Sequence, residues 1–147
     1  MIRLHPISLR PFLTIIAAFV LSVTGLSQTD HVGLWTGVDH GEVGHIQLGA
    51  DEYAFFVING DTLGGKSFSM REQLACMKYE VEYGADMHSV DFIIYTLPDN
   101  FHMATLPGIF ALTDTGTLRL CLNFEGGERP SSFVEEDTIE LTKVRGN

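Results

Sequence analysis

One segment has the residue types and spacing of a phosphate-binding loop. Residues 60–67, Gly-Asp-Thr-Leu-Gly-Gly-Lys-Ser, satisfy the pattern G-x-x-x-x-G-K-[ST], in which Lys66 would reach nucleotide phosphates and Ser67 would hold Mg²⁺. Such a loop also requires a parallel sheet with helical crossovers, and only residues 69–78 have helical character. We therefore interpret residues 60–67 as a glycine-rich turn between two strands, and nucleotide-dependent catalysis is a remote alternative.

A second group of potential ligands comes earlier in the chain. Asp39, His40, Glu42 and His45 fall within seven residues, and imidazole with carboxylate binds Zn²⁺ where three or four ligands converge. His40 and His45 fall on opposite faces of a regular strand, however, so a polar turn with solvated histidines is the preferred interpretation. These two histidines are kept as remote metal candidates.

Nucleophilic catalysis has no supporting motif. The sequence contains no G-x-S-x-G elbow and no cysteine set beside a base. We therefore predict no catalytic residue and no cofactor, and expect the protein not to be an enzyme.

The amino terminus has the pattern of a secretory signal peptide. Arg3 and Arg10 give a positive start, and residues 12–23 form an apolar run shorter than the roughly 20 residues that a bilayer span needs. Small residues stand at the −3 and −1 positions before Gln28. The pattern predicts that residues 1–27 are cleaved and that the protein is secreted or periplasmic. An uncleaved anchor is the alternative.

The remaining residues 28–147 have the length of one ordinary domain. Removing Arg3 and Arg10 from the 9 basic residues leaves 7 against 19 acidic ones, a net charge of −12. This balance argues against nucleic acid, whose binding depends on clustered Lys and Arg, and against an anionic membrane surface after cleavage. A negative field favours cationic partners without naming one. The sequence leaves the oligomeric state open.

Apolar and polar residues alternate with a period of two in many short segments, which indicates a meandering all-β protein. We expect a small antiparallel barrel of about eight strands with at most one short helix, because closure removes exposed sheet edges. A two-sheet sandwich is the competing architecture. The expected strands are residues 33–37, 42–48, 52–58, 66–70, 77–83, 88–96, 101–106, 109–112, 118–124 and 138–144.

Two cysteines, Cys76 and Cys121, make one disulfide conceivable in an exported chain. Alternation places Cys76 on the polar face of its strand, with Lys78, and places Cys121 beside Arg119. Two outward thiols pair only where their strands are neighbours, because a disulfide needs Cα atoms within about 7 Å. The sequence leaves both outcomes open.

The carboxy-terminal half resembles a known signature. Residues 108–112 (GIFAL), 114–121 (DTGTLRLC) and 128–133 (ERPSSF) are similar to the lipocalin-like small β-barrel domain of uncharacterised exported proteins of planctomycete type. Phe110 stands where that family usually has Tyr, and the turn before the DTGTLRLC strand is longer. The resemblance implies a β-barrel and supplies no activity. Considered alone, Arg129-Pro130 has a structural interpretation, in which Pro fixes a loop and Arg ties it to carbonyls or a carboxylate.

Two roles follow for a small barrel, which either fills its interior with side chains or holds one ligand. The first is a non-enzymatic binding module for a small apolar ligand or peptide. The second is an envelope protein with a solid barrel that binds another protein or acts in a stress response. An internal cavity of roughly 300 Å³ or more would favour the first role. Its candidate lining residues are Trp35, Tyr79, Tyr83, Phe92, Ile94 and Leu120, although core packing is the preferred interpretation of Trp35.

Overall fold

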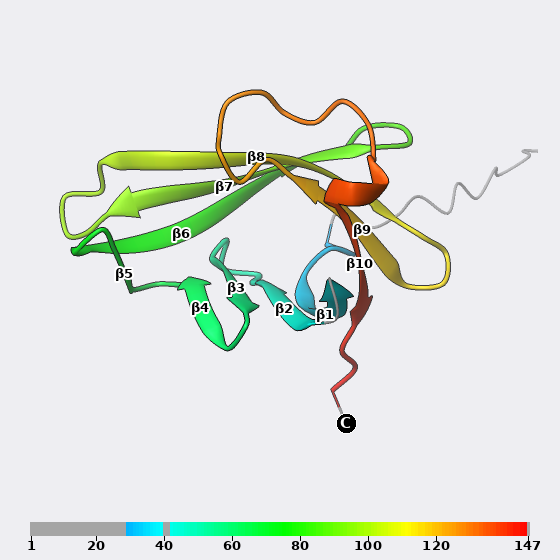
Figure 1. Ribbon diagram of the computed structural model, residues 1–147, viewed down its shortest axis with the longest axis horizontal. Coiled ribbons are helices and arrows are strands. Elements are labelled where there is room, and N and C mark those ends of the chain that lie inside the picture. Colours follow the sequence, from blue (N-terminus) through cyan, green and yellow to red (C-terminus); the bar gives the residue numbers. More distant parts are fainter. Residues whose placement is uncertain (1–28, 40–41, 147) are drawn as a thin grey trace, which may run out of the picture.

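A single antiparallel sheet of ten strands curls into a nearly closed barrel (Figure 1). The computed structural model describes residues 29–39 and 42–146. The predicted signal peptide, residues 1–27, lies outside the described residues. Within the described part, the only helical element is a single 3-10 turn, and no helix is long and apolar enough to cross a bilayer. The predicted all-β barrel is confirmed, with ten strands where about eight were expected.

The strands follow one another as a meander, and the last returns to pair with the first. The order across the sheet is β4-β3-β2-β1-β10-β9-β8-β7-β6-β5. The elements are β1 (Gly33–Asp39), β2 (Glu42–Leu48), β3 (Ala54–Ile58), β4 (Asp61–Gly64), β5 (Phe68–Met70), β6 (Gln73–Glu82), β7 (His88–Thr96), β8 (His102–Leu112), β9 (Thr117–Leu122), the 3-10 turn η1 (Glu135–Asp137) and β10 (Thr138–Lys143).

The period-two pattern separates an inner from an outer face. On β7, His88, Val90, Phe92 and Ile94 are buried, while the residues between them are partly exposed. Cross-strand register carries this face around the barrel, since directly paired residues share a face. One such row runs from Trp35 through its partners on β2 and β10. The result is one apolar core inside the barrel.

The segment expected to be helical, residues 69–78, is instead a β-hairpin. Met70 pairs with Gln73, so β5 and β6 are joined by a two-residue turn. Its residues Arg71 and Glu72 have φ values of 50° and 63°, the left-handed conformation of a type I′ turn that usually selects Asn or Gly. The helix prediction was wrong because pairing of β6 with β7 outweighs local helix propensity.

Two strand pieces, residues 101–106 and 109–112, were expected on either side of Pro107, but residues 102–112 form the single strand β8. Gly108 is paired with Leu122, the last residue of β9. Pro107 lies one residue beyond that pair, where its carbonyl accepts a hydrogen bond from the Asn123 amide at 3.0 Å. The proline nitrogen, which lacks a proton, therefore faces the end of β9 and removes no bond from the paired ladder.

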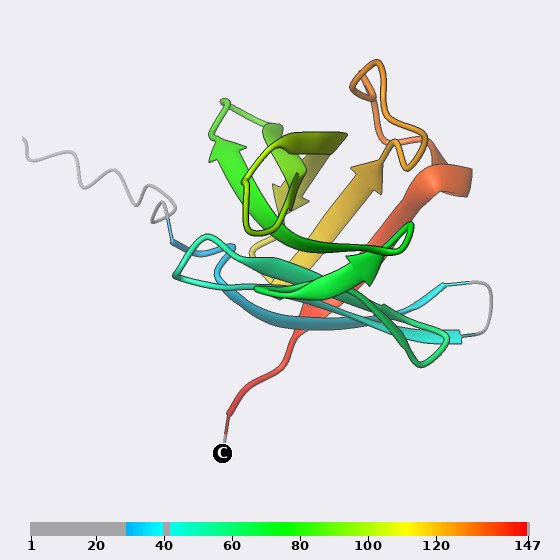
Figure 2. The ribbon, with the colours of Figure 1, turned by 90° about the vertical axis from the view of Figure 1, so that its left-hand side faces the viewer.

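The barrel closes at only one end of the β3–β4 hairpin. Where β3 begins, the Tyr79 amide donates to the Glu52 carbonyl at 2.9 Å, and the Met77 amide donates to the Gly65 carbonyl at 2.9 Å. Tyr53 and Lys78 form a bridge between the same segments. Figure 2 shows the sheet curling so that this part of the hairpin approaches β6. At the other end of the hairpin, the Asn59-Gly60 turn forms no such bond among the described residues.

We expect Gly64→Ala to lower the free energy of unfolding by about 2–4 kcal/mol. Gly64 has a φ of 107°, and a Cβ there would lie 2.2 Å from the Met77 side chain and 2.6 Å from the Ala54 carbonyl oxygen. Gly60→Ala is the matched control, because its φ is 83° and a Cβ there meets nothing within 4 Å. Strain alone predicts a loss of about 1 kcal/mol for Gly60→Ala. Equal losses in urea titrations of the two variants would contradict a closure contact at Gly64.

A strap formed by residues 123–137 lies over the outer face of β7, β8 and β9 (Figure 1). Arg129 fastens it by donating hydrogen bonds to the Val90 carbonyl at 3.1 Å, the Gly108 carbonyl at 2.8 Å and the Asp91 carboxylate at 2.9 Å. The interpretation of Arg129 as a loop tie to carbonyls and a carboxylate is confirmed. Pro130 lines a small hollow beside Ile109 on the sheet below.

We expect Arg129→Lys to destabilise the protein by about 1–2 kcal/mol, because a lysine ammonium cannot reproduce the planar fork that reaches both strands. The unfolding midpoint in urea measures the loss. Arg71→Lys is the control, because Arg71 is exposed in the two-residue turn between β5 and β6. If both variants lose the same stability, the fork at Arg129 does not hold the strap.

Cys76 and Cys121 are free thiols, and each is only 2% exposed. Cys76, which pairs with Tyr95, and Cys121 both lie on the outward faces expected from alternation, although neither thiol is exposed there. Cys121 pairs with Ile109 on the outer face of the sheet, and both are buried under the strap. The two thiols belong to β6 and β9, which have β7 and β8 between them.

Candidate functional site

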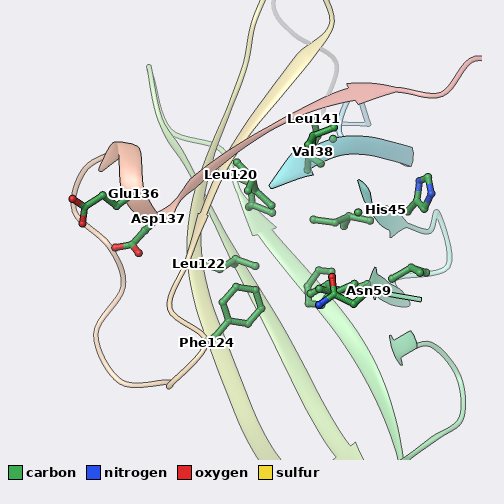
Figure 3. Close-up of a pocket in the computed structure, with 16 residues that line it drawn as sticks. Val38, His45, Asn59, Leu120, Leu122, Phe124, Glu136, Asp137 and Leu141 are labelled. Carbon is green, nitrogen blue, oxygen red and sulfur yellow. The ribbon is translucent and has the colours of Figure 1, made fainter. Parts of the chain in front are cut away.

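An apolar cavity of about 430 Å³ lies at the open end of the barrel. Its walls come from β1, β2 and β3 on one side and from β9, β10 and the adjoining η1 turn on the other. Figure 3 shows Leu120, Leu122 and Phe124 following one another along one wall, with Asn59 facing them from the β3–β4 turn. Its lining includes Ile58 and Asn59 at the far end of β3 and no residue of β6.

The inner part of the cavity consists of core side chains. Ile46, Phe56, Leu120, Leu122 and Leu141 line it, and none is more than 8% exposed. Each belongs to the inward face of its strand by the register of the sheet. These walls offer van der Waals contact and no hydrogen-bonding side chain, so they suit an apolar group.

Two glycines form part of the cavity wall on β1 and β2. Gly37 and Gly44 are cross-strand partners, both line the cavity, and the register places both on the inner face. A Cβ at Gly44 would meet only the Val57 carbonyl oxygen, at 3.5 Å. By contrast, a Cβ at Gly37 would lie 2.5 Å from the Glu140 carbonyl oxygen. Gly37 therefore allows β10 to approach closely, and Gly44 borders open space.

The rim combines exposed apolar side chains with polar groups. Val38, Ile58 and Phe124 are 63%, 46% and 55% exposed, respectively, and all three line the cavity. The Phe124 ring lies edge-on to the buried Phe56 ring, with centroids 6.3 Å apart, so apolar surface continues from the floor to the rim. Four polar or charged side chains also line the cavity, those of His45, Asn59, Glu136 and Asp137.

The opposite end of the barrel is filled by aromatic and histidine side chains. His31 Nδ1 and the Tyr83 hydroxyl share a hydrogen bond of 2.6 Å, and Trp35 Nε1 donates to the His31 carbonyl at 2.8 Å. The Tyr79 hydroxyl donates to the Gly49 carbonyl at 2.7 Å. His88 Nδ1 accepts from the Gly84 amide at 3.1 Å. We call this set, together with Phe110, the aromatic plug.

The six predicted lining residues are thus divided between the two ends. Leu120 lines the cavity, whereas Trp35, Tyr79 and Tyr83 belong to the aromatic plug. Phe92 and Ile94 lie in the core between the two ends, and the Phe92 ring contacts Phe56 with centroids 4.7 Å apart.

Sequence reasoning missed the glycine pair and the η1 carboxylates. Alternation from Trp35 places Gly37 on the inner face, and a glycine in a strand interior often marks a close approach or a gap. That signal was available in the sequence. The position of Glu136 and Asp137 was not, because it depends on the path of the strap across the sheet.

Burial in the plug suppresses the charged forms of its titratable groups. Burial lowers the pKa of His31, and the nearby Lys143 lowers it further while Asp30 opposes the shift. Burial also lowers the pKa of His88. It raises the pKa of Tyr79 to about 12. The plug is therefore neutral at neutral pH.

We expect the protein to lose stability as the pH falls below about 6.5, the ordinary histidine pKa. Both plug histidines have lowered pKa values in the folded chain, so below that pH the unfolded chain binds more protons. Each pH unit in this window removes at most about 1.4 kcal/mol per histidine. In His88→Asn, which keeps an acceptor near the Gly84 amide, the urea midpoint should fall less on acidification than in the wild type.

The control for this measurement is His102→Asn, because His102 is exposed and hydrogen bonds only to Thr105. Its midpoint should fall as steeply as that of the wild type. An unchanged acid dependence in His88→Asn would show that burial of this imidazole does not set the acid limit of stability.

The two segments with possible catalytic chemistry do not form an active site. Residues 59–60 form a two-residue turn, with φ values of 56° and 83°, and residues 61–64 form strand β4. The element that follows the glycine-rich segment is strand β5 and not a helix. Lys66 makes an exposed ion pair with Asp51 at 3.0 Å. His40 lies outside the described residues, and His45 is partly buried on β2. Within the described part of the chain, no group of three His, Cys, Asp or Glu is placed to hold a metal ion.

Comparison with known proteins gives no match: no family model, no curated protein and no solved structure is significantly similar to this chain. The barrel is therefore established by its own strand pairing, and the cavity must be interpreted from its own chemistry.

Proposed function

We propose that this protein is an exported, lipocalin-like binding module that holds a small apolar ligand in the open end of its barrel. One observation carries the proposal, the cavity of about 430 Å³ with a core-like apolar floor. Its volume falls within the roughly 300–1,000 Å³ of small-molecule sites. It also exceeds the roughly 300 Å³ that separates a hollow from a solid barrel in the sequence-based alternatives.

The chemistry of the walls supports an apolar ligand over a polar one. Burying a methylene group against such walls contributes about 0.8 kcal/mol, whereas a buried polar group without a partner costs about 1–3 kcal/mol. The side chains of the floor offer no such partner. Polar groups line only the rim, where a ligand's polar end would stay in contact with water.

The exposed rim side chains fit the same role. An apolar ligand leaving water meets Val38, Ile58 and Phe124 before the buried floor, so the apolar path has no polar barrier. The second role, an envelope protein that binds another protein, is supported by the same three side chains, since exposed apolar groups also suit a protein interface. The depth of the cavity favours the ligand, because a protein surface gains nothing from a hollow that it cannot fill.

We expect Gly44→Val to abolish binding of an uncharged apolar fluorophore such as N-phenyl-1-naphthylamine without lowering stability. The new side chain would project into the cavity, since a Cβ at Gly44 meets only one atom within 4 Å. Replacing a strand glycine should itself stabilise the fold by about 0.5–1 kcal/mol. Fluorescence titration measures binding, and urea unfolding measures stability.

Thr142→Val is the matched control, because Thr142 pairs with Thr36 and Thr117 on the outer face of the barrel. It introduces the same side chain on a strand and should leave fluorophore binding unchanged. Undiminished binding by a stably folded Gly44→Val protein would refute the cavity as the ligand site.

A further inference from the structure

We propose that the cavity selects apolar ligands that carry a positively charged head group, such as a primary amine, and disfavours apolar carboxylates. This inference rests on the proposed function, since it assigns the head-group charge of a ligand in the same cavity. It comes from the distribution of charge around the rim. The cavity itself is the site, and the rim carboxylates determine which end groups fit it.

Two carboxylates line the cavity, those of Glu136 and Asp137 from η1, and neither Lys nor Arg is among the lining residues. The imidazole of His45, partly buried on β2, is the other titratable side chain of the lining. In Figure 3 both side chains stand at the η1 end of the cavity, with Asp137 nearer than Glu136 to Leu122 and Phe124, and the Glu136 carboxylate points away from these apolar side chains. A head group at this end of a ligand would therefore lie closer to Asp137 than to Glu136.

Among the described residues, these two carboxylates have no basic partner. Elsewhere on the barrel the described residues pair acid with base, as in Asp51 with Lys66, Asp91 with Arg129 and Glu140 with Arg119. In the described part of the chain, no Lys or Arg lies within ion-pair distance of Glu136 or Asp137. An incoming ammonium would thus gain two carboxylate neighbours without displacing a protein partner, whereas an incoming carboxylate would meet uncompensated like charge.

The charge of the whole chain acts in the same direction. Residues 28–147 contain 7 basic and 19 acidic residues, so the field at a distance attracts cations and repels anions. This contribution extends over about 10 Å at moderate ionic strength and is screened by added salt. The rim pair differs from this general field because it acts at one place, next to the apolar wall.

The expected selectivity is moderate because the rim is exposed to water. Exposed ion pairs change an equilibrium by about 1.5- to 5-fold. We therefore expect a decylammonium ion to bind about threefold more tightly than decan-1-ol and about tenfold more tightly than decanoate. The three ligands have the same apolar chain, so their differences report the head group alone.

The experiment displaces N-phenyl-1-naphthylamine from the full chain with each decyl compound, below its micelle concentration, at low and high salt. The test variant is Glu136→Gln/Asp137→Asn, which keeps the shape of both side chains. The control is Asp114→Asn, because Asp114 is exposed in the turn between β8 and β9, at the other end of β9 from the cavity. Circular dichroism confirms that each variant is folded.

Support for the inference is a preference for amine over carboxylate that the rim variant reduces to less than about threefold, while Asp114→Asn retains most of it. If decan-1-ol binds but all three head groups bind alike, the charge inference is overturned and the proposed function stands. The same conclusion follows if both variants weaken the preference equally, since only the general field would then act. If no decyl compound displaces the fluorophore, the proposed function fails, and this inference fails with it.

Discussion

The structure depends on how the barrel closes. The sheet could close along the whole β3–β4 hairpin, yet its backbone bonds to β6 form only where β3 begins, through Glu52 and Gly65. Gly64 is essential to this arrangement, because only a residue without a side chain fits against Met77 and the Ala54 carbonyl with a φ of 107°. At the far end of the hairpin, Ile58 and Asn59 line the cavity, whose other wall comes from β9 and β10. The backbone contacts at Glu52 and Gly65 therefore close the barrel at the end away from the cavity.

Size differences among inward-facing side chains then determine which end is filled. At the closed end, the large rings of Trp35, Tyr79 and His88 fill the interior. Their polar atoms form hydrogen bonds with backbone groups. At the open end, the corresponding positions on β1 and β2 are Gly37 and Gly44. A barrel of this size has enough inward positions to be solid throughout. Gly44 leaves space on the inner face at the open end, whereas Gly37 lets the β10 backbone and Leu141 approach closely.

The sequence predicts features that depend on neighbouring residues and misses those that depend on distant ones. Period-two alternation is local, so most of the strands could be predicted. Strand β4 was missed, because its residues 61–64 were interpreted as part of a glycine-rich turn over residues 60–67. The role of Arg129 could be predicted as well, because arginine beside proline in a polar loop has few structural uses. The turn at Arg71-Glu72 could not, because its left-handed residues are held there by pairing between strands. Leu120 was the one predicted lining residue at the cavity, since alternation cannot tell which end of the barrel stays open.

The strap links the outer face of the sheet to the rim of the cavity. It leaves β9 at Phe124, crosses the outer face where Arg129 holds it, and returns as η1 with Glu136 and Asp137 before β10 begins. Both an apolar rim residue and the acidic rim residues therefore belong to a strap whose ties, Arg129 and the contact of Arg119 with Phe133, lie outside the cavity. A guanidinium is suited to this task because its fixed donors reach a carboxylate and two carbonyls at once. The shape and charge of the opening thus depend on a contact on the opposite face of the sheet, which a search of the cavity walls alone would not find.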